Sequence, residues 1–141
     1  MKNRSLILLA LAVFLLSCSC FKTKKNNLDK SIEKVYGVEW KLVSINLSDE
    51  AIIPPVGRVT ITFTEAGNVN GNGGCNRFSG KFEIKENKLS ITDIMSTRRA
   101  CEIMKVESAV IKALKDVDNF SAVGNQLLLK KGEEVLLTYT K

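Results

Sequence analysis

The sequence of 141 residues contains no histidine. This absence excludes serine–histidine and cysteine–histidine nucleophile pairs, histidine-ligated zinc and any histidine acting as a general base. Aromatic residues are also scarce, at 6% of the chain. The contents of 45% hydrophobic and 26% charged residues are nonetheless typical of a globular protein, and the length fits one domain.

The sequence also lacks a hydrophobic run long enough to span a membrane as a helix. Its longest apolar run, residues 6–16, would reach about half-way across a hydrocarbon core of ~30 Å. The run follows the basic residues Lys2 and Arg4, as in an export signal, and ends in a Leu-Leu-Ser-Cys sequence at Cys18 that resembles a bacterial lipobox. We therefore expect residues 1–17 to be a removed lipoprotein signal peptide and Cys18 to be the acylated first residue.

Two alternatives to lipidation at Cys18 stay open. Cys20 would place Ser17 three residues upstream, where an aliphatic residue is expected. An ordinary cleaved signal peptide would make the cysteine incidental. A diacylglycerol thioether with an amide-linked acyl chain suffices for stable anchoring. The expected location is therefore the bacterial cell envelope, on the extracytoplasmic side of a membrane, which is the outer membrane where the cell has one.

The formal net charge of +6 invites a nucleic-acid interpretation, but little of it belongs to the expected domain. Two positive charges leave with the signal peptide. Residues 18–31 carry a net +3, are rich in lysine and asparagine and lack hydrophobic periodicity, so we expect a flexible basic tether. Residues 32–141 hold 15 basic and 14 acidic side chains. We therefore expect no nucleic-acid partner, and a tether that lies beside anionic lipid headgroups.

Residues 32–141 carry the signals of one antiparallel domain. Apolar and polar residues alternate over 58–64, 78–84 and 88–92, which predicts half-buried strands. Further strands are expected at 38–45, around Phe120, at 127–129 and at 135–139. Apolar residues spaced by three and four over 103–117 predict one amphipathic helix. The predicted fold is mainly β (α+β), a small antiparallel barrel or roll of about eight strands with this helix packed on it.

Residues 68–78 are unusually rich in glycine and asparagine. A glycine-rich loop can hold phosphate, but nucleotide-binding loops have a strand before them and a helix after them. Here a predicted strand follows. We therefore interpret the stretch as a loop in which glycine and asparagine allow turns with positive φ and a close approach of the backbone.

Cys75 and Cys101 are the cysteines outside the expected anchor region. In an exported domain their default state is an intramolecular disulfide. Closing the loop between them would stabilise the fold by roughly 3 kcal/mol. The alternative is a reactive thiol or metal pair, but two thiolates without histidine make a poor zinc or copper site.

Two adjacent arginines, Arg98 and Arg99, precede the predicted helix. Guanidinium groups bind carboxylate or phosphate in a bidentate manner, so the pair is a candidate anion clamp. We favour a solvated loop whose arginines form ion pairs with Glu102 or Glu107. The lone tryptophan, Trp40, is more typical of a core anchor than of a ligand-stacking platform. No pair of acidic residues in the sequence indicates a general acid and a general base.

The order of these motifs resembles the META/HslJ-type (DUF306-like) domain over about residues 35–139. The runs Gly-Gly-Cys-Asn-Arg-Phe-Ser-Gly at 73–80 and Thr-Arg-Arg-Ala-Cys at 97–101 carry the resemblance, although the family usually has methionine at position 99. The resemblance implies a compact β fold, an envelope lipoprotein and a loose link to stress response or antibiotic tolerance, with no catalytic residues to transfer. The motif positions are Trp40, Gly74, Cys75, Asn76, Gly80, Thr97, Arg98, Arg99 and Glu107.

The function we expect is that of a non-enzymatic, lipid-anchored binding or interaction module, without a cofactor. Its expected partners are the membrane, through the anchor, and an unidentified envelope protein or small ligand. The alternative is an envelope protein that binds a small molecule, an anion or a metal through the Gly71–Asn76 loop together with Arg98 and Arg99.

Overall fold

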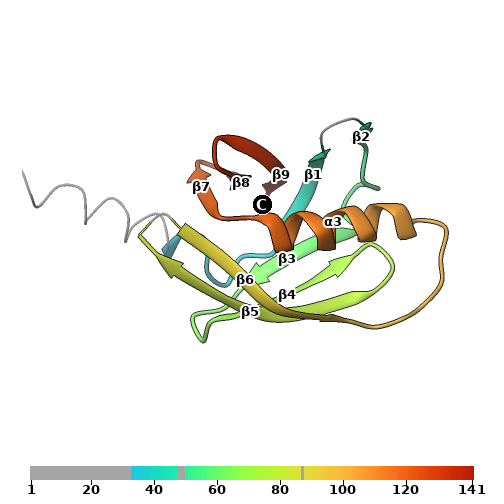
Figure 1. The fold of residues 1–141 in the computed structure, drawn as a ribbon, viewed down its shortest axis with the longest axis horizontal. Helices are drawn as coiled ribbons and strands as arrows, with labels where there is room; N and C mark the ends of the chain where they lie inside the picture. The colour runs from blue at the N-terminus through green and yellow to red at the C-terminus, as the bar shows by residue number, and fades with distance from the viewer. Residues whose placement is uncertain (1–32, 48–49, 87) are drawn as a thin grey trace, which may run out of the picture. The chain divides into compact units, whose positions relative to one another are not determined.

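Strands form most of the structure, as the alternating sequence pattern predicts. The computed structural model describes residues 33–47, 50–86 and 88–141, which belong to one compact unit. The expected signal peptide, the lipidation candidates Cys18 and Cys20, and the tether lie outside the described residues. Six strands precede the helix α3 and three follow it (Figure 1). These elements are β1 (Trp40–Leu47), β2 (Glu50–Ile52), β3 (Val59–Phe63), β4 (Asn68–Gly73), β5 (Arg77–Lys85), β6 (Lys88–Ser96), α3 (Met104–Asp116), β7 (Asn119–Val123), β8 (Gln126–Lys131) and β9 (Glu134–Thr140).

All the strand pairs of the sheet are antiparallel, and the sheet closes on itself. The strand order is β2-β1-β3-β4-β5-β6-β7-β8-β9, and β1 also pairs with β9. Eight of the described strands therefore form a ring, while the short strand β2 pairs with the last residues of β1. The prediction of a mainly β, closed antiparallel fold with a packed helix is confirmed.

The ring is not a regular barrel, because its strands pair over unequal lengths. Strands β5 and β6 pair along most of their length, whereas β6 and β7 meet in a single residue pair, Lys88 with Asn119. Helix α3 connects these two strands and contacts β6, β4, β1 and β9 (Figure 1). The helix thus connects the two strands whose pairing is thinnest.

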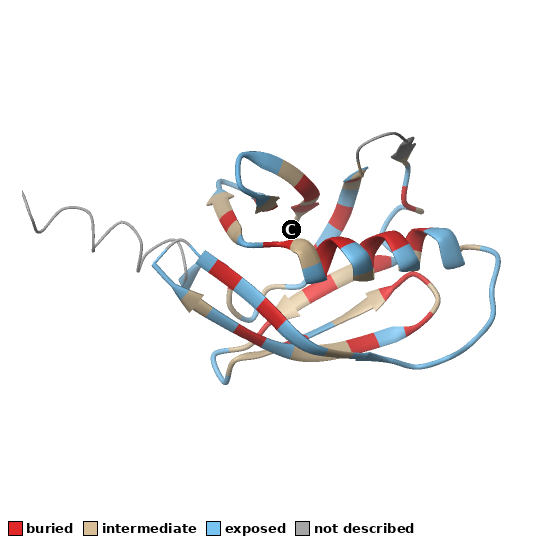
Figure 2. Ribbon diagram, in the orientation of Figure 1, coloured by how far each residue is buried: buried red, intermediate tan, exposed pale blue. Residues whose placement is uncertain are grey.

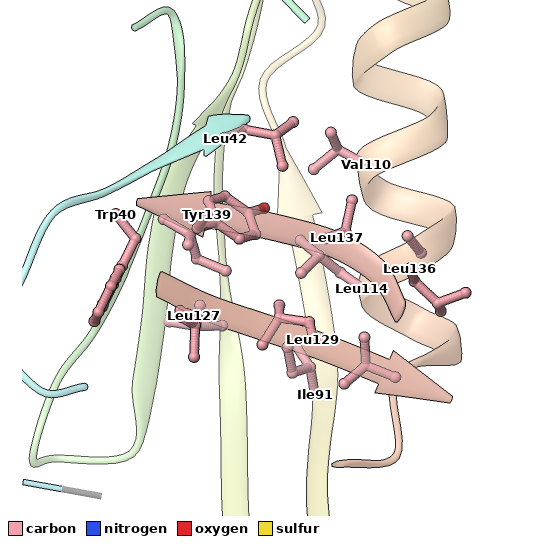
Figure 3. Close-up of a cluster of buried hydrophobic side chains, with 14 of the residues drawn as sticks. Trp40, Leu42, Ile91, Val110, Leu114, Leu127, Leu129, Leu136, Leu137 and Tyr139 are labelled. Carbon is pink, nitrogen blue, oxygen red and sulfur yellow. The ribbon is translucent and has the colours of Figure 1, made fainter. Parts of the chain in front are cut away.

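The core lies between the inner face of the sheet and one face of α3 (Figure 2). In β3 the alternation predicted from sequence is complete, with Val59, Ile61 and Phe63 buried. The helix buries every third or fourth residue, as its periodicity predicts. Figure 3 shows side chains of β1, β8 and β9 meeting the helix in this cluster. The buried residues of α3 are Val106, Ala109, Val110, Ala113 and Leu114.

Trp40 is a core anchor, as predicted. Its side chain is 1% exposed, and its indole Nε1 donates a hydrogen bond to the carbonyl oxygen of Val35 at 3.1 Å. An indole N–H that is removed from water needs such a partner. Trp40 therefore offers no surface on which a ligand could stack.

The prediction that the glycine-rich stretch is a loop was wrong over much of its length. Residues 68–73 form β4, which pairs with β3 on one side and β5 on the other. At Gly71 a Cβ atom would collide with the carbonyl oxygen of Thr60 and the ring of Phe78. The ring of Phe78 thus fills the space that a side chain at Gly71 would occupy. Glycine and asparagine have a low strand propensity, so the sequence did not indicate this strand.

None of the described helices is both long and apolar enough to cross a membrane.

Candidate functional site

The motif residues meet where the turn between β4 and β5 faces the first turn of α3. Gly74 occupies this turn with φ of +110°, and its amide donates a hydrogen bond to Oδ1 of Asn72 at 2.8 Å. A Cβ on Gly74 would lie 2.9 Å from Cδ1 of Ile103, just before the helix. Only glycine meets both requirements without strain.

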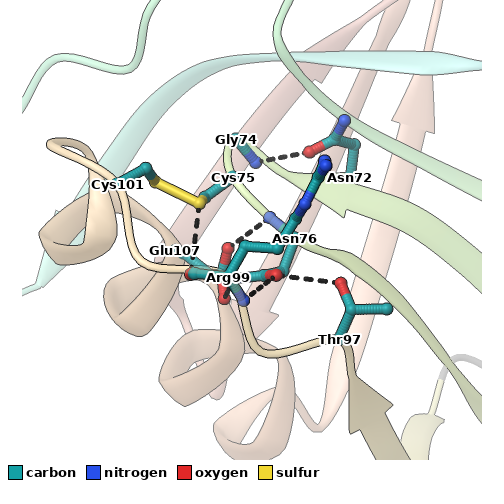
Figure 4. The surroundings of a disulfide bond; sticks show 8 residues. All are labelled: Asn72, Gly74, Cys75, Asn76, Thr97, Arg99, Cys101 and Glu107. Carbon is teal, nitrogen blue, oxygen red and sulfur yellow. Dashed lines mark hydrogen bonds between the residues drawn. A yellow bond between two sulfur atoms is a disulfide. The ribbon is translucent and has the colours of Figure 1, made fainter.

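Asn76 follows this turn and is buried, with 2% of its surface exposed. Its side-chain Nδ2 donates to Oε1 of Glu107 and to the carbonyl oxygen of Arg99, both at 3.0 Å. Its Oδ1 accepts from the hydroxyl of Thr97 at 2.9 Å and from the amide of Arg99 at 2.7 Å (Figure 4). An asparagine amide offers two donors and two acceptor lone pairs, so its side chain is fully used.

The backbone of Asn76 is held as firmly as its side chain. Its amide donates to Oε2 of Glu107 at 2.7 Å, and its carbonyl oxygen accepts from the amide of Gly73 at 2.8 Å. Glu107 therefore binds Asn76 through both carboxylate oxygens. We call Asn76, Thr97, Arg99 and Glu107 the Asn76 clamp, because together they fix the β4–β5 turn to the segment before α3 and to the helix itself.

A disulfide crosses the same junction. The structure joins the sulfur atoms of Cys75 and Cys101, with 6.2 Å between their Cα atoms (Figure 4). Cys75 belongs to the β4–β5 turn, and Cys101 precedes α3. The covalent bond and the Asn76 clamp thus hold the same two segments together.

The ion pairs expected for Arg98 and Arg99 are not formed. Both residues are exposed, and the salt bridges within the described ranges join Lys85 to Glu83 and Lys131 to Asp116. The physical reason is that both oxygens of Glu107 already accept hydrogen bonds from Asn76. Arg99 contributes its backbone amide and carbonyl to the clamp, which leaves its side chain outside it.

Gly80, like Trp40 in the core, lies outside the Asn76 clamp. It lies within β5, opposite Val69 of β4, at the place where the pairing of β5 with β6 shifts by one residue. A Cβ there would lie 2.8 Å from the carbonyl oxygen of Thr92, so the position serves a close approach of two strands.

The clamp is a set of hydrogen bonds centred on Asn76. The side-chain amide of Asn76 is fully paired within it, and both carboxylate oxygens of Glu107 accept hydrogen bonds from Asn76. Among the residues that the structure describes, no group of three or more cysteine, aspartate or glutamate side chains could hold a metal ion. Within the Gly71–Asn76 stretch, residues 71–73 belong to β4, and residues 74–76 form the turn that the clamp and the disulfide hold.

A depression that the sequence did not indicate lies beside the clamp on β4, β5 and β6. It has a volume of about 540 Å³. Arg77, next to Asn76 in the chain, lines it. This arginine lies within the run at 73–80 that carries the family resemblance, but the sequence did not indicate it as a binding residue. We call this depression the Arg77 groove; its lining residues are Asn70, Gly71, Arg77, Phe78, Ser79, Met95, Ser96 and Thr97.

A closed antiparallel sheet, braced at one turn by a buried asparagine and a disulfide, defines a class of small β domains with one packed helix. The family is shown by comparison: the META domain model matches residues 33–141, and the chain belongs to the META domain family. The family expected from the sequence motifs is thereby confirmed.

Solved structures agree with this assignment. A protein from Burkholderia xenovorans, determined by NMR, is similar at 26% identity and a TM-score of 0.64, covering 77% of this chain and 83% of its own. A second NMR structure shares 26% identity with a TM-score of 0.57, covering 77% of this chain and 92% of its own. A DUF4847 family protein from Bacteroides vulgatus shares the fold at 14% identity and a TM-score of 0.60, over 77% and 94% of the two chains. No curated protein matches the chain.

Proposed function

We propose that this protein is a lipid-anchored component of the bacterial cell envelope whose META domain acts as a non-enzymatic binding or interaction module. The observation that carries the proposal is the state of the motif residues. The side chain of Asn76 is hydrogen-bonded to both Thr97 and Glu107, and the backbone amide of Asn76 also binds Glu107. This mutual pairing favours a structural role for the motif over an active site. A domain built in this way would act through its surface.

Anchoring is supported by the sequence at the N-terminus. A basic start, a short apolar run and a lipobox-like cysteine together favour acylation at Cys18. The lysine-rich residues that follow would reinforce contact with anionic headgroups. In this proposal the domain is held near a membrane, where a role in stress response or antibiotic tolerance would be exercised on envelope components.

Membrane fractionation of the full chain in a bacterial host tests the anchor. Cys18→Ala should move the protein out of the membrane fraction, and Cys20→Ala is the matched control that should leave it there. Loss of membrane association in Cys20→Ala alone would place the lipid at the other cysteine. Unchanged fractionation of both variants would refute lipid anchoring.

Thermal shift measurements test the binding role, because a ligand that binds the folded state alone raises the melting temperature. A screen of anions, divalent metals and antibiotics separates the leading proposal from the alternative that Arg98 and Arg99 hold a small ligand. A shift that disappears in Arg98→Gln would favour that alternative. A hydrolytic or transfer activity that disappears in Glu107→Gln, in protein that remains folded, would overturn the non-enzymatic proposal.

A further inference from the structure

We infer that the Arg77 groove is a binding site for an oxyanion, the carboxylate or phosphate group of a ligand. This inference rests on the proposal that the domain is a binding module, and it names the site and the class of ligand. It does not depend on the lipid anchor. The solved relatives consist almost entirely of this domain, with up to 94% of their chain covered, so residues 33–141 can be studied alone.

The strand register arranges the side chains of the groove. Asn70 lies opposite Ser79, which in turn lies opposite Met95, and Asn72 lies opposite Arg77. Since alternate residues of a strand share one face, these two rows stand on the same face of the sheet. The row between them includes Gly71 and the buried Phe78. Its backbone therefore forms the floor of the groove.

Three polar side chains of the groove are available to bind a ligand. Asn70, Arg77 and Ser79 make no side-chain hydrogen bond or ion pair with another described residue. Asn76 of the clamp, by contrast, has no hydrogen-bonding group left over. An amide, a guanidinium group and a hydroxyl group thus offer donors in the same place.

The charge around the groove favours an anion. Strands β3 and β4 carry no charged residue, and residues 77–82 of β5 contain Arg77 and Lys81 but no carboxylate. Lys81 is engaged, because its Nζ donates to Oδ1 of Asn68 at 2.6 Å. Asp93 of β6 does not line the groove, and its Oδ2 accepts a hydrogen bond from the hydroxyl of Thr92 at 3.4 Å. Among the residues that the structure describes, Arg77 is therefore the free cation of the groove.

The backbone of Arg77 is also well fixed. Its carbonyl oxygen accepts a hydrogen bond from the amide of Thr97 at 3.1 Å, and the preceding residue is Asn76 of the clamp. A guanidinium group binds the two oxygens of a carboxylate or phosphate in a bidentate manner, and the fixed backbone sets the place in the groove from which this side chain extends. Met95, 69% exposed at the rim, would contact the apolar part of such a ligand.

NMR titration of isotope-labelled residues 33–141 with sodium phosphate, and separately with sodium succinate, tests the site at constant ionic strength. Saturable shifts are expected for the amides of Asn70, Arg77 and Ser79. Arg77→Gln should weaken the binding at least tenfold. Arg58→Gln is the matched control, an exposed arginine outside the groove, and should change the affinity less than twofold.

The inference is overturned by a saturable response that is equal in the wild type and in Arg77→Gln. A response that does not saturate excludes a free anion as the ligand, and it overturns the inference when anionic vesicles also fail to retain the domain. An equal loss in Arg58→Gln would also overturn it, because general screening of surface charge would then explain the shifts. Such results would leave the membrane fractionation of Cys18→Ala unaffected, so the inference and the anchoring proposal can fail separately.

Sedimentation with vesicles identifies the source of the oxyanion. Residues 33–141 are incubated with vesicles of phosphatidylcholine alone or with one quarter phosphatidylglycerol. Retention on the anionic vesicles that is lost in Arg77→Gln identifies a lipid headgroup as the ligand. Saturable binding of phosphate or succinate without retention on vesicles identifies a free anion, and both results support the site. Binding in neither measurement refutes it.

Discussion

Asn76 and Arg77 are neighbours in the chain, but they occupy opposite environments. Asn76 is buried with every hydrogen-bonding group used, while Arg77 is exposed and its guanidinium group is free among the described residues. The most distinctive motif of the sequence therefore forms the buried clamp that holds the fold together. The Arg77 groove on the surface of this fold is lined partly by residues of the runs at 73–80 and 97–101, but no binding motif in the sequence marks it.

The largest effect is expected from Asn76→Ala. The substitution removes four side-chain hydrogen bonds and leaves one carboxylate oxygen of Glu107 and the backbone amide and carbonyl of Arg99, all part-buried, without that partner. We expect the free energy of unfolding to fall by about 3–5 kcal/mol. Urea denaturation measures this value. Arg77→Ala is the control and should change the free energy of unfolding by no more than about 0.5 kcal/mol. Equal losses in the two variants would contradict the structural role assigned to Asn76.

The next effect concerns the disulfide at the same junction. Replacing Cys75 and Cys101 together by serine removes a cross-link between residues 26 apart in the sequence. The chain-entropy relation for a loop of this size gives a loss of roughly 3 kcal/mol. Denaturation of the double variant is compared with that of the wild type in reducing buffer, and both should be destabilised to a similar degree. A wild type that is indifferent to reductant would contradict this role.

A smaller effect is expected from Glu107→Gln. Glutamine keeps one acceptor oxygen, but it turns an amide group towards the donating amide of Asn76 in place of the second oxygen. Stability should fall by about 1–2 kcal/mol. Glu102→Gln is the matched control, since Glu102 is exposed and outside the clamp, and it should leave the unfolding midpoint almost unchanged. A similar midpoint for both variants would show that the carboxylate of Glu107 is not needed.

The smallest effect is expected at a buried polar group that, unlike Asn76, has no hydrogen-bond partner among the described residues. The hydroxyl of Tyr139 is fully buried and makes no hydrogen bond to any described residue. Tyr139→Phe removes this unpaired group, so stability at neutral pH should stay equal or rise by up to about 1 kcal/mol. A clear loss, measured by urea denaturation, would show that the hydroxyl has a partner in solution.

The same residue predicts how stability depends on pH. Burial raises the pKa of Tyr139 far above its usual value, so the phenol stays neutral in the folded state while the unfolded chain ionises near pH 10. The raised pKa of Tyr139 therefore leaves the free energy of unfolding unchanged below pH 10 and lowers it as the pH rises above that value. Urea midpoints at pH 7 and pH 10.5 should differ less in Tyr139→Phe than in the wild type. Equal differences in the two proteins would contradict the shift.

The sequence predicted those parts of the fold where one face of an element is regularly apolar. Residues 59–63 and the helix at 104–116 follow their periods closely, and both were predicted. The strand β4 was missed because Gly71 is matched by the ring of Phe78, which belongs to the next strand. A local pattern contains no information about a side chain that another strand supplies. The short strand β2, which pairs with the end of β1 alone, also gave no clear signal.

The candidate site was predicted as a set of residues but not as an arrangement. The family resemblance marked Asn76 and Glu107, which lie 31 positions apart, but spacing alone could not show that one binds the other. Arg98 and Arg99 attracted attention as adjacent charges, whereas the structure uses the backbone of Arg99 and leaves both side chains exposed. Arg77 was overlooked because a single arginine in a strand is ordinary. Its environment depends on register across three strands.

The pairing of β1 with β9 has a consequence for how the protein is made. The first long strand of the domain finds this partner in residues 134–140, at the far end of the domain. The ring therefore cannot close until almost the whole domain has been synthesised, and its contacts are distant in the sequence. A nascent chain would remain open until its last strand is released. Such delayed folding would suit the export that we propose for this chain, since an exported polypeptide passes through a translocation channel in an unfolded state.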